Sequence, residues 1–285
     1  MKTKPAIVMQ TDFTKDISVC TMQGVCMMVD PELRVFDSTH DIRSFDTYQA
    51  STSLSFVVDF WPAGTVFVSV VDPGVGTGRR ACVARLKNGS YVVTPDNGSL
   101  THLKKFFGIE EVRIIDETRN RLQKTKKCHI FHGRDLFAYC GARLAAGVIT
   151  YGEVGESYPV EEIVEHEIIP YQADGGRISG MIDAIDYHFG LICTNIPAEV
   201  FEENGISFGD MLHVAIRNRN RQEPVFEGNV AYVPSFGSVE KGEPLLMTSE
   251  TLQIQIATNC VNMAEAYDIH EGPDWTMEIE KEVKA

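Results

Sequence analysis

The chain has 285 residues, of which 44% are hydrophobic and 23% are charged. This composition is typical of a globular protein with one large domain or two moderate ones. Its formal net charge of −14 argues against nucleic acid as the main partner, because phosphate binding needs clustered Lys and Arg. No run approaches the roughly 18 apolar residues of a membrane-spanning helix, so we expect no membrane partner.

The seven cysteines are scattered, odd in number and form no C-x-x-C pair. This spacing argues against a disulfide framework and against a structural zinc site. We therefore expect reduced thiols, a cytoplasmic location and no bound metal.

In the first half of the chain, short β-rich runs each end in an acidic or glycine-rich loop. The predicted strands cover 7–9, 34–36, 66–71, 91–93 and 112–115, and helices are predicted at 48–60 and 100–107. Strands that alternate with helices predict a largely parallel sheet with helices on its faces. Ligands bind outside the carboxyl ends of such strands, where Asp12, Asp72 and Asp96 lie.

The segment D-P-G-V-G-T-G-R (72–79) follows the third predicted strand. It lacks the Lys-Ser/Thr ending of a P-loop and the spacing of a dinucleotide fingerprint. Its glycines permit a tight turn that brings Arg79 back towards Asp72. A surface turn with an ordinary ion pair is the alternative.

The segment F-H-G-R-D (131–135) precedes the clearest predicted helix, which we expect Asp135 to cap and Gly147 to end. His132 lies just before the helix N-terminus, where the helix dipole disfavours an imidazolium. A neutral imidazole can accept a proton near pH 7. A structural histidine is the alternative, and the neighbouring His129 is a second candidate.

After about residue 165 the helical runs stop and short alternating segments follow. The predicted strands cover 177–185, 190–195, 211–216, 229–233 and 252–257. They predict an all-β domain, a small barrel or a sandwich, with the chain after Asp274 loosely attached. We place the boundary near 165–176, which gives domains at 1–166 and 175–285. In the second domain, Asp186 beside an aromatic suits a ligand with a charge and a flat ring, although an ordinary β-bend explains it equally.

Eight short motifs, in this order, carry a resemblance to a known family. They are T-D-F (11–13), Q-G-V (23–25), D-x-T-H-D (37–41), F-W-P-x-G-T-V (60–66), D-P-G-V-G-T (72–77), P-D-N-G (95–98), F-H-G-R-D (131–135) and D-x-x-F-G (186–190). The set resembles the S-adenosyl-L-methionine (SAM) hydroxide adenosyltransferase family, relatives of the fluorinases and chlorinases, through nearly the whole chain. The resemblance implies a SAM hydrolase that releases adenosine and L-methionine without a metal or a further cofactor, SAM being the substrate.

The resemblance also implies an architecture: a three-layer α/β domain joined to a β-barrel domain. It further implies a homotrimer, with each site between the first domain of one subunit and the second domain of its neighbour.

Roles follow from the same resemblance. Asp72, Arg79 and His132 match the triad thought to position and activate water. Asp12 matches the carboxylate that binds the ribose hydroxyls, and Phe45 matches an aromatic beside the sugar. The remaining matches are Phe189 and Phe236 around adenine, Asp16 and Asp186 near the methionine ammonium, and Ser249 in the late serine motif.

The chain departs from the family pattern at three places. The loop after Phe13 is shortened, Leu191 stands where the family has Asn at the adenine edge, and the motif around Ser249 has shifted spacing. Two other functions therefore stay open: halide transfer to SAM, and a non-catalytic SAM- or adenosine-binding protein. Halide transfer needs a dry, uncharged pocket, whereas Asp72 and His132 would supply a carboxylate and a base.

Overall fold

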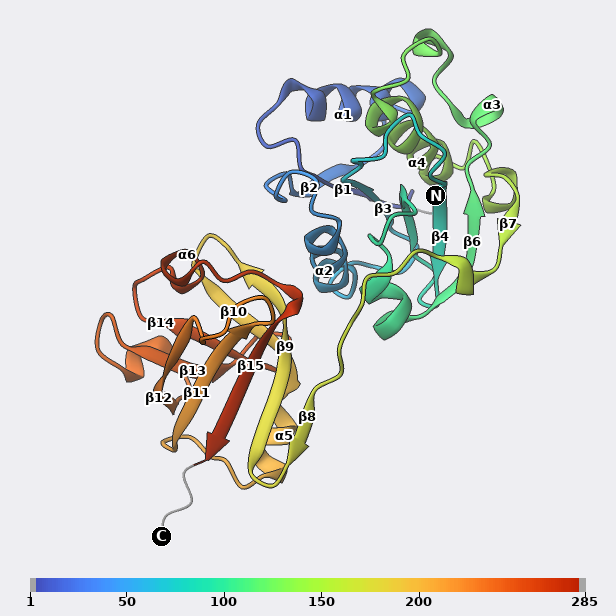
Figure 1. The fold of residues 1–285 in the computed structure, drawn as a ribbon. Helices are drawn as coiled ribbons and strands as arrows, with labels where there is room; N and C mark the ends of the chain where they lie inside the picture. The colour runs from blue at the N-terminus through green and yellow to red at the C-terminus, as the bar shows by residue number, and fades with distance from the viewer. Residues whose placement is uncertain (1–3, 282–285) are drawn as a thin grey trace. The chain divides into compact units, whose positions relative to one another are not determined.

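The computed structural model describes residues 4–281 and divides them at His166/Glu167 into two compact units. The first unit is an α/β domain and the second is a β-barrel (Figure 1). The predicted fold class is confirmed. No helix within the described residues is long and apolar enough to cross a membrane.

The sheet of the first unit has seven strands in the order β2-β1-β3-β5-β4-β6-β7. The strands are β1 (Ile7–Thr11), β2 (Val35–Thr39), β3 (Val66–Val70), β4 (Ala81–Leu86), β5 (Tyr91–Pro95), β6 (Ile109–Ile114) and β7 (Ser157–Tyr158). Strands β2, β1, β3 and β5 run parallel, whereas β4, β6 and β7 add antiparallel pairs. Strands β1 and β3 are buried along their whole length, because both faces of the sheet are covered.

Helices cover the two faces of this sheet, which makes three layers (Figure 1). The longer helical elements are α1 (Ile17–Val29), α2 (Thr47–Val58), the π-helix η1 (Leu103–Phe107), the π-helix η3 (Gly133–Ala138) and α4 (Tyr139–Ala145). Ile7 and Met9 point to the core beneath α1, η3 and α4. Val8 points to the core beneath α2 and η1. Successive side chains of β1 therefore contribute to the cores on opposite faces of the sheet.

Short elements complete the first unit. They are α3 (Glu117–Asn120) and the 3-10 turns η2 (Gln123–Thr125), η4 (Tyr151–Glu153) and η5 (Val160–Glu162).

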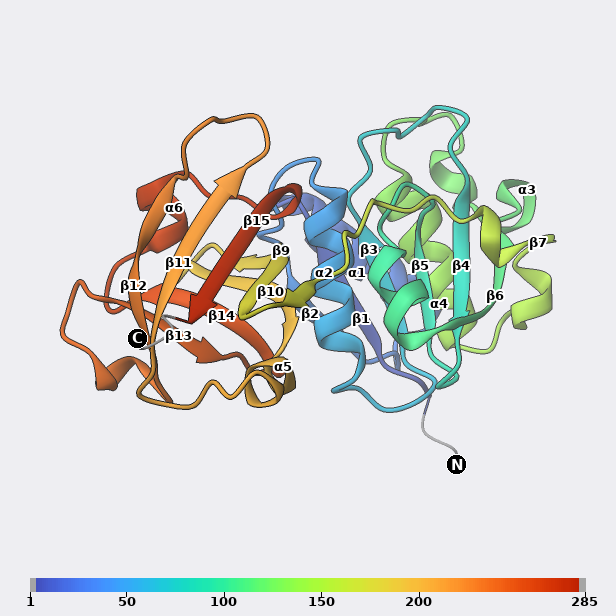
Figure 2. The same cartoon turned by 60° about the horizontal axis from the view of Figure 1, so that its bottom comes forward.

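The second unit closes seven strands into a barrel, because β9 and β10 pair directly. These strands are β9 (Arg177–Asp186), β10 (Leu191–Pro197), β11 (Met211–Asn218), β12 (Phe226–Tyr232), β13 (Pro244–Thr248), β14 (Gln253–Thr258) and β15 (Gly272–Lys281). An eighth strand, β8 (Gln172–Asp174), pairs with β9 outside this ring. Burial alternates along β10, so its inward side chains fill the barrel core. Figure 2 shows β11, β15 and β9 side by side in the barrel wall.

Three local expectations are wrong. Residues 275–281 are not loose: they lie within β15, which pairs with β11 and β9 and buries Trp275, Met277 and Ile279. The last part of the predicted tail, 282–285, lies outside the described residues. Helices do not stop at residue 165, because α5 (Ala198–Glu203) and α6 (Met263–Tyr267) belong to the second unit, together with the 3-10 turn η6 (Phe236–Ser238).

Asp135 is the third wrong expectation, because it caps no helix. It lies inside η3, fully buried, and its carboxylate accepts hydrogen bonds from Arg134. The helix starts three residues earlier than the capping pattern suggests, with His132 at the N-cap position. Gly147 does follow the helix, with the positive φ of 69° that favours glycine.

Candidate active site

Two acidic residues lie at the carboxyl edge of the parallel strands. Asp12 directly follows β1, and Asp72 lies two residues beyond β3. Strands β1 and β3 are parallel neighbours in register from Ile7↔Val66 to Thr11↔Val70, so both residues belong to the same edge of the sheet. This is the edge at which open α/β sheets bind ligands.

Arg79 folds back onto Asp72, as the spacing of the glycine loop predicts. Its Nε donates to Asp72 Oδ1 at 2.9 Å, and its Nη2 donates to Oδ2. Both side chains are nearly buried, at 6% exposed for Asp72 and 10% for Arg79. The turn between them needs Gly76, whose φ is +76° and whose added Cβ would lie 3.0 Å from His129 O. An ion pair held this far from water has fixed geometry, and removing one partner leaves a buried charge.

His132 joins this pair through the same guanidinium nitrogen. Arg79 Nη2 lies 3.0 Å from His132 Nδ1, and His132 is 5% exposed. Because a guanidinium only donates hydrogen bonds, Nδ1 is the acceptor, and the proton of the neutral ring is on Nε2. His132 Nε2 is buried and has no hydrogen-bond partner in the described part of the chain.

The surroundings of His132 keep its ring neutral. Burial is the largest cause that lowers its pKa below 6.5, and the positive charges of Arg79 and Arg121 act in the same direction. Glu117 and Asp72 act in the opposite direction, but the net pKa is lowered. The ring is therefore a neutral hydrogen-bonding group at pH 7.

The glycine that follows His132 sets the position of the ring against the sheet. An added Cβ on Gly133 would lie 3.1 Å from Val70 Cγ1, at the end of β3. The backbone can approach this closely only because residue 133 has no side chain. A π-helix begins here, and such turns often occur at functional sites.

Asp12 holds a strained residue. Its Oδ2 accepts a hydrogen bond of 2.9 Å from the backbone N–H of Phe45. Phe45 has a φ of 70°, which is rare for a bulky side chain, and its ring is 71% exposed. Backbone strain of this kind is typical of ligand-binding segments.

His40 and Asn97 support the two acidic residues, and neither was among the predicted site residues. His40 Nδ1 lies 2.9 Å from Thr11 Oγ1, and its carbonyl accepts a hydrogen bond from Thr14 N at 2.7 Å. Asn97 Nδ2 donates to the carbonyl of Val71 at 3.0 Å, directly before Asp72. Both residues follow a strand and belong to a motif: His40 to D-x-T-H-D (37–41) and Asn97 to P-D-N-G (95–98). That position in the sequence could have identified them.

Two other acids have structural partners. Asp16 caps α1, with Oδ1 accepting from Ser18 N at 2.7 Å, and these hydrogen bonds lower its pKa. Asp96 is buried and accepts hydrogen bonds from Arg80, Tyr158 and Val164 N. Asp96 therefore fixes the last segment of the first unit, which contains Tyr158 and Val164, to the end of β5.

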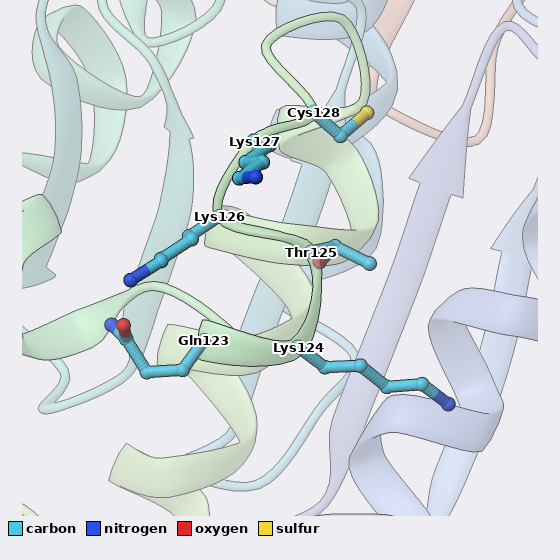
Figure 3. Close-up of a pocket in the computed structure, with 6 residues that line it drawn as sticks. All are labelled: Gln123, Lys124, Thr125, Lys126, Lys127 and Cys128. Carbon is cyan, nitrogen blue, oxygen red and sulfur yellow. The ribbon is translucent and has the colours of Figure 1, made fainter.

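The lysine-rich loop at Gln123–Cys128 lines an open surface pocket of about 450 Å³. Figure 3 shows the side chains of Lys124 and Lys126 pointing away from each other. All three lysines of the loop are exposed. Because the ammonium groups diverge, the loop has the character of a solvated surface segment.

In the second unit, Asp186 and Phe189 share the turn between β9 and β10. Asp186 Oδ1 accepts from the backbone N–H groups of His188 and Phe189, at 2.9 and 3.2 Å. Phe189 is 63% exposed, with His188 packed edge-on against it at 4.7 Å. The aromatic ring is thus held out from the turn by backbone hydrogen bonds.

Strand β10 connects this turn to Ser249. Leu191 and Cys193 alternate with the inward residues of β10, and Cys193 Sγ lies 3.6 Å from Ser249 Oγ. Leu191 packs on the apolar cluster that also holds Met247 and Val239. Val239 follows η6, which starts at the partly exposed Phe236. Asp186 and Phe189 therefore share one turn, and Ser249 lies beside β10 through its contact with Cys193.

Two further features bear on cofactors. Within residues 4–281, no cluster of three or more His, Cys, Asp or Glu is arranged to hold a metal ion. The seven cysteines are free, and burial raises the pKa of the Cys26, Cys82, Cys140 and Cys193 thiols to about 12.

The chain matches known families over both units. Residues 7–155 match the SAM hydroxide adenosyltransferase N-terminal domain, and residues 180–276 match the C-terminal domain of the same family. The chain belongs to this family. The resemblance seen in the eight motifs is thereby confirmed.

Relatives within and around the family carry two different names. An (R)-S-adenosyl-L-methionine hydrolase of Salinispora arenicola is 37% identical over 240 residues, covering 84% of this chain and 90% of that protein. A fluorinase of Actinopolyspora mzabensis is 27% identical over 296 residues, covering 94% and 95%. An uncharacterized conserved protein of Thermotoga maritima has a similar crystal structure, with a TM-score of 0.85 at 30% identity over 96% of this chain and 100% of that one.

Proposed function

We propose that this member of the family is a SAM hydrolase that transfers hydroxide from water to the ribose 5′ carbon and releases adenosine and L-methionine. The observation that carries the proposal is the buried triad of Asp72, Arg79 and His132, with one histidine nitrogen left unpartnered. Such an arrangement suits a small polar molecule such as water.

The chemistry needs little beyond an oriented water. The sulfonium makes methionine a neutral thioether leaving group, so no acid is required at that end. Water oxygen forms the new bond to C5′, the C5′–S bond breaks with its electron pair going to sulfur, and one proton leaves the attacking oxygen. Orientation of a reactant can lower a barrier by several kcal/mol, and general base catalysis contributes roughly 10²–10⁴-fold.

The first unit, 1–166, supplies the triad and the ribose contacts in this proposal. Asp12 binds the ribose hydroxyls, Phe45 packs beside the sugar, and Asp16 lies near the methionine ammonium. The position of Asp12 at the carboxyl edge of the sheet, bonded to the backbone of Phe45, and the exposure of Phe45 support these assignments.

The barrel unit, 175–285, supplies the other contacts. Phe189 and Phe236 pack on adenine, Asp186 binds the methionine ammonium, and Ser249 adds a hydroxyl. We propose that these come from a neighbouring subunit of a homotrimer. The exposed ring of Phe189 supports the assignment, because an unburied aromatic on a rigid turn is available to stack.

Halide transfer is the competing function, because fluorinases are among the relatives. A halide is already a nucleophile and needs no proton acceptor, whereas the triad contains a carboxylate and a histidine that both contact Arg79 Nη2. We therefore propose water as the nucleophile. Fluoride or chloride offered in excess should give no 5′-halogenated adenosine.

The test is chromatography of SAM incubated with pure protein. Adenosine and methionine should accumulate in equal amounts, with full activity after EDTA treatment. Strict dependence on a divalent ion would contradict the proposed mechanism, and SAM binding without turnover would indicate a non-catalytic binding protein. We also propose that the enzyme works in the cytoplasm, a reducing compartment in which its seven free thiols are stable.

A further inference from the structure

His166, the last residue of the first unit, is bonded to the segment that carries Phe45. His166 Nε2 lies 3.0 Å from Thr47 Oγ1, in a hydrogen bond between residues 119 positions apart in the chain. Thr47 is the first residue of α2 and follows Phe45 by two positions. The end of the first unit is therefore joined to the loop that contacts Asp12.

The ring of His166 occupies a fixed place beside the first turn of α2. A Cβ added to Gly98 would overlap this ring, so the ring takes its position only because residue 98 has no side chain. The ring of Tyr48 lies against it, with the two centroids 5.3 Å apart. The backbone N–H of His166 donates to Thr101 Oγ1 at 2.9 Å. These contacts hold the imidazole where it meets Thr47.

The loop before Thr47 makes two tight bends in succession. Phe45 has a φ of 70°, and Asp46, with φ −83° and ψ 89°, is close to an inverse γ-turn in which Thr47 N donates to Phe45 O at 3.1 Å. A strained conformation of this kind persists only where surrounding contacts hold it. Asp12 Oδ2 holds the backbone N–H of Phe45, and His166 holds Thr47 on the other side of the bends.

We infer that His166 is a positioning residue for ribose binding. It fixes Thr47, and through the Phe45 loop it fixes the orientation of the Asp12 carboxylate. The inference rests on the proposed function, in which Asp12 binds the ribose hydroxyls. Two neighbouring hydroxyls can both donate to one carboxylate only when that carboxylate is correctly oriented, and the hydrogen bond from Phe45 N supplies the orientation.

Helix α2 has other anchors, so the His166 contact is not needed to keep the helix in place. Gln10 Nε2 donates to the carbonyl of Ala50 at 2.8 Å, and Ser51 Oγ accepts from the backbone N–H of His102 at 3.0 Å. Both contacts lie one turn further along α2. Loss of the His166 side chain should therefore loosen the Phe45 loop while the helix stays folded.

The test uses two nucleosides that differ only in the ribose hydroxyls. Titration calorimetry of the whole protein gives the Kd values of adenosine and of 2′,3′-dideoxyadenosine, which lacks both hydroxyls assigned to Asp12. We expect His166→Ala to weaken adenosine binding about fivefold, as one lost hydrogen bond does, and to leave the Kd of dideoxyadenosine unchanged. Equal weakening of both nucleosides, or weakening of neither, would overturn the inference.

Matched variants separate positioning from a general loss of stability. Thr47→Val removes only the hydroxyl partner, so it should reproduce the effect of His166→Ala, and the double variant should bind no more weakly than either single variant. His166→Gln keeps a side chain that can hydrogen-bond Thr47 and should restore the adenosine affinity. His213→Ala, at a partly exposed histidine of β11, is the control and should bind both nucleosides as the wild type does. If His166→Ala does not fold, the Thr47→Val result decides.

Failure of this inference differs from failure of the proposed function. If the wild-type protein hydrolyses SAM and the variants bind adenosine as tightly as it does, the function stands and the positioning role is wrong. If the wild-type protein consumes no SAM but the variants lose affinity for adenosine alone, the hydrolysis is wrong and the positioning role stands. A wild-type protein that binds neither nucleoside would overturn the positioning role.

Discussion

Asp12 and Asp72 lie at one edge of the sheet but have different partners. Asp72 is held by two hydrogen bonds from Arg79, whereas Asp12 Oδ2 accepts a hydrogen bond from the backbone N–H of Phe45. One residue is therefore built into the triad, and the other into a strained loop that faces solvent. Their substitutions should affect different kinetic constants.

We predict that Asp12→Ala raises KM at least about tenfold with a smaller change in kcat, because it removes ribose binding common to ground and transition states. Asp72→Ala should lower kcat at least about tenfold, because it disrupts the triad that orients and activates the water. Steady-state kinetics measure both. A kcat loss in Asp12→Ala as large as that in Asp72→Ala would place Asp12 in the chemical step instead.

The lowered pKa of His132 predicts the pH dependence. The charged groups that face it are Arg79 and Arg121, which lower the pKa, and Glu117 and Asp72, which raise it, while burial is the largest cause. The pKa of His132 in the folded protein is below 6.5, so the neutral ring contributes fully to the free energy of unfolding above pH 6.5. This contribution is lost as the pH falls from 6.5 through the lowered pKa. Protonation would also break the Arg79 contact at Nδ1.

We therefore predict constant kcat/KM from about pH 8 down to about pH 6.5, followed by a decrease at lower pH. The profile in His132→Gln should lack this decrease at the same pH, which makes that variant the control. A decrease that begins well above pH 6.5 would mean that the imidazole is not kept neutral.

A helix or strand could be predicted where its own residues showed the hydrophobic pattern of that structure. The mostly apolar run of β3 and the helical spacing of α2 predicted elements that the structure contains. Helix α1 lacks charged residues and has several β-branched ones, so it depends on its Asp16 cap and on packing of Val19, Met22 and Cys26. Such tertiary support cannot be read from a single segment.

Strand β15 shows the same limit. Its start at Gly272-Pro273-Asp274 and its charged residues suggested a loose tail. Yet Trp275, Met277 and Ile279 alternate inward and β11 and β9 flank the strand on both sides. The pairing partners come from distant segments, and a long-range register of this kind is not visible locally.

We predict that Met277→Ala lowers the free energy of unfolding by about 2–5 kcal/mol, because Met277 is fully buried in the barrel core. Its neighbour Thr276 is only partly buried, so Thr276→Ala should change it by about 0.5 kcal/mol or less. Urea denaturation of both variants is the measurement. Equal small effects would mean that β15 contributes little to the barrel core.

The triad was predictable in part. The glycine spacing predicted that Arg79 returns to Asp72, and the two side chains do pair. The sequence did not show which nitrogen of His132 Arg79 contacts, because that depends on how η3 packs Gly133 against β3.

At the scale of the whole molecule, each unit has its own core. One large cluster fills the barrel, and two others lie on the two faces of the α/β sheet. The change in pattern near residue 165 predicted two domains, and the units divide at His166/Glu167. Sequence spacing cannot tell whether an active site is formed by the two units of one chain or by the first unit of one chain and the second unit of another.

Subunit complementation decides this. We predict that inactive His132→Ala and inactive Asp186→Ala subunits, mixed so that they exchange, regain activity, because some sites then receive two intact halves. The matched control mixes His132→Ala with Asp72→Ala, which damage the same unit and should stay inactive. Confirmed exchange without recovery, or an active monomer, would contradict a shared site.

The central claim is that water supplies the oxygen that appears on the adenosine product. The most direct measurement is mass spectrometry of adenosine formed from SAM by the pure protein in ¹⁸O-labelled water. We predict one ¹⁸O atom at the 5′ position of every adenosine formed, with methionine unlabelled. Adenosine without the label, or a 5′-halogenated product in its place, would contradict hydroxide transfer.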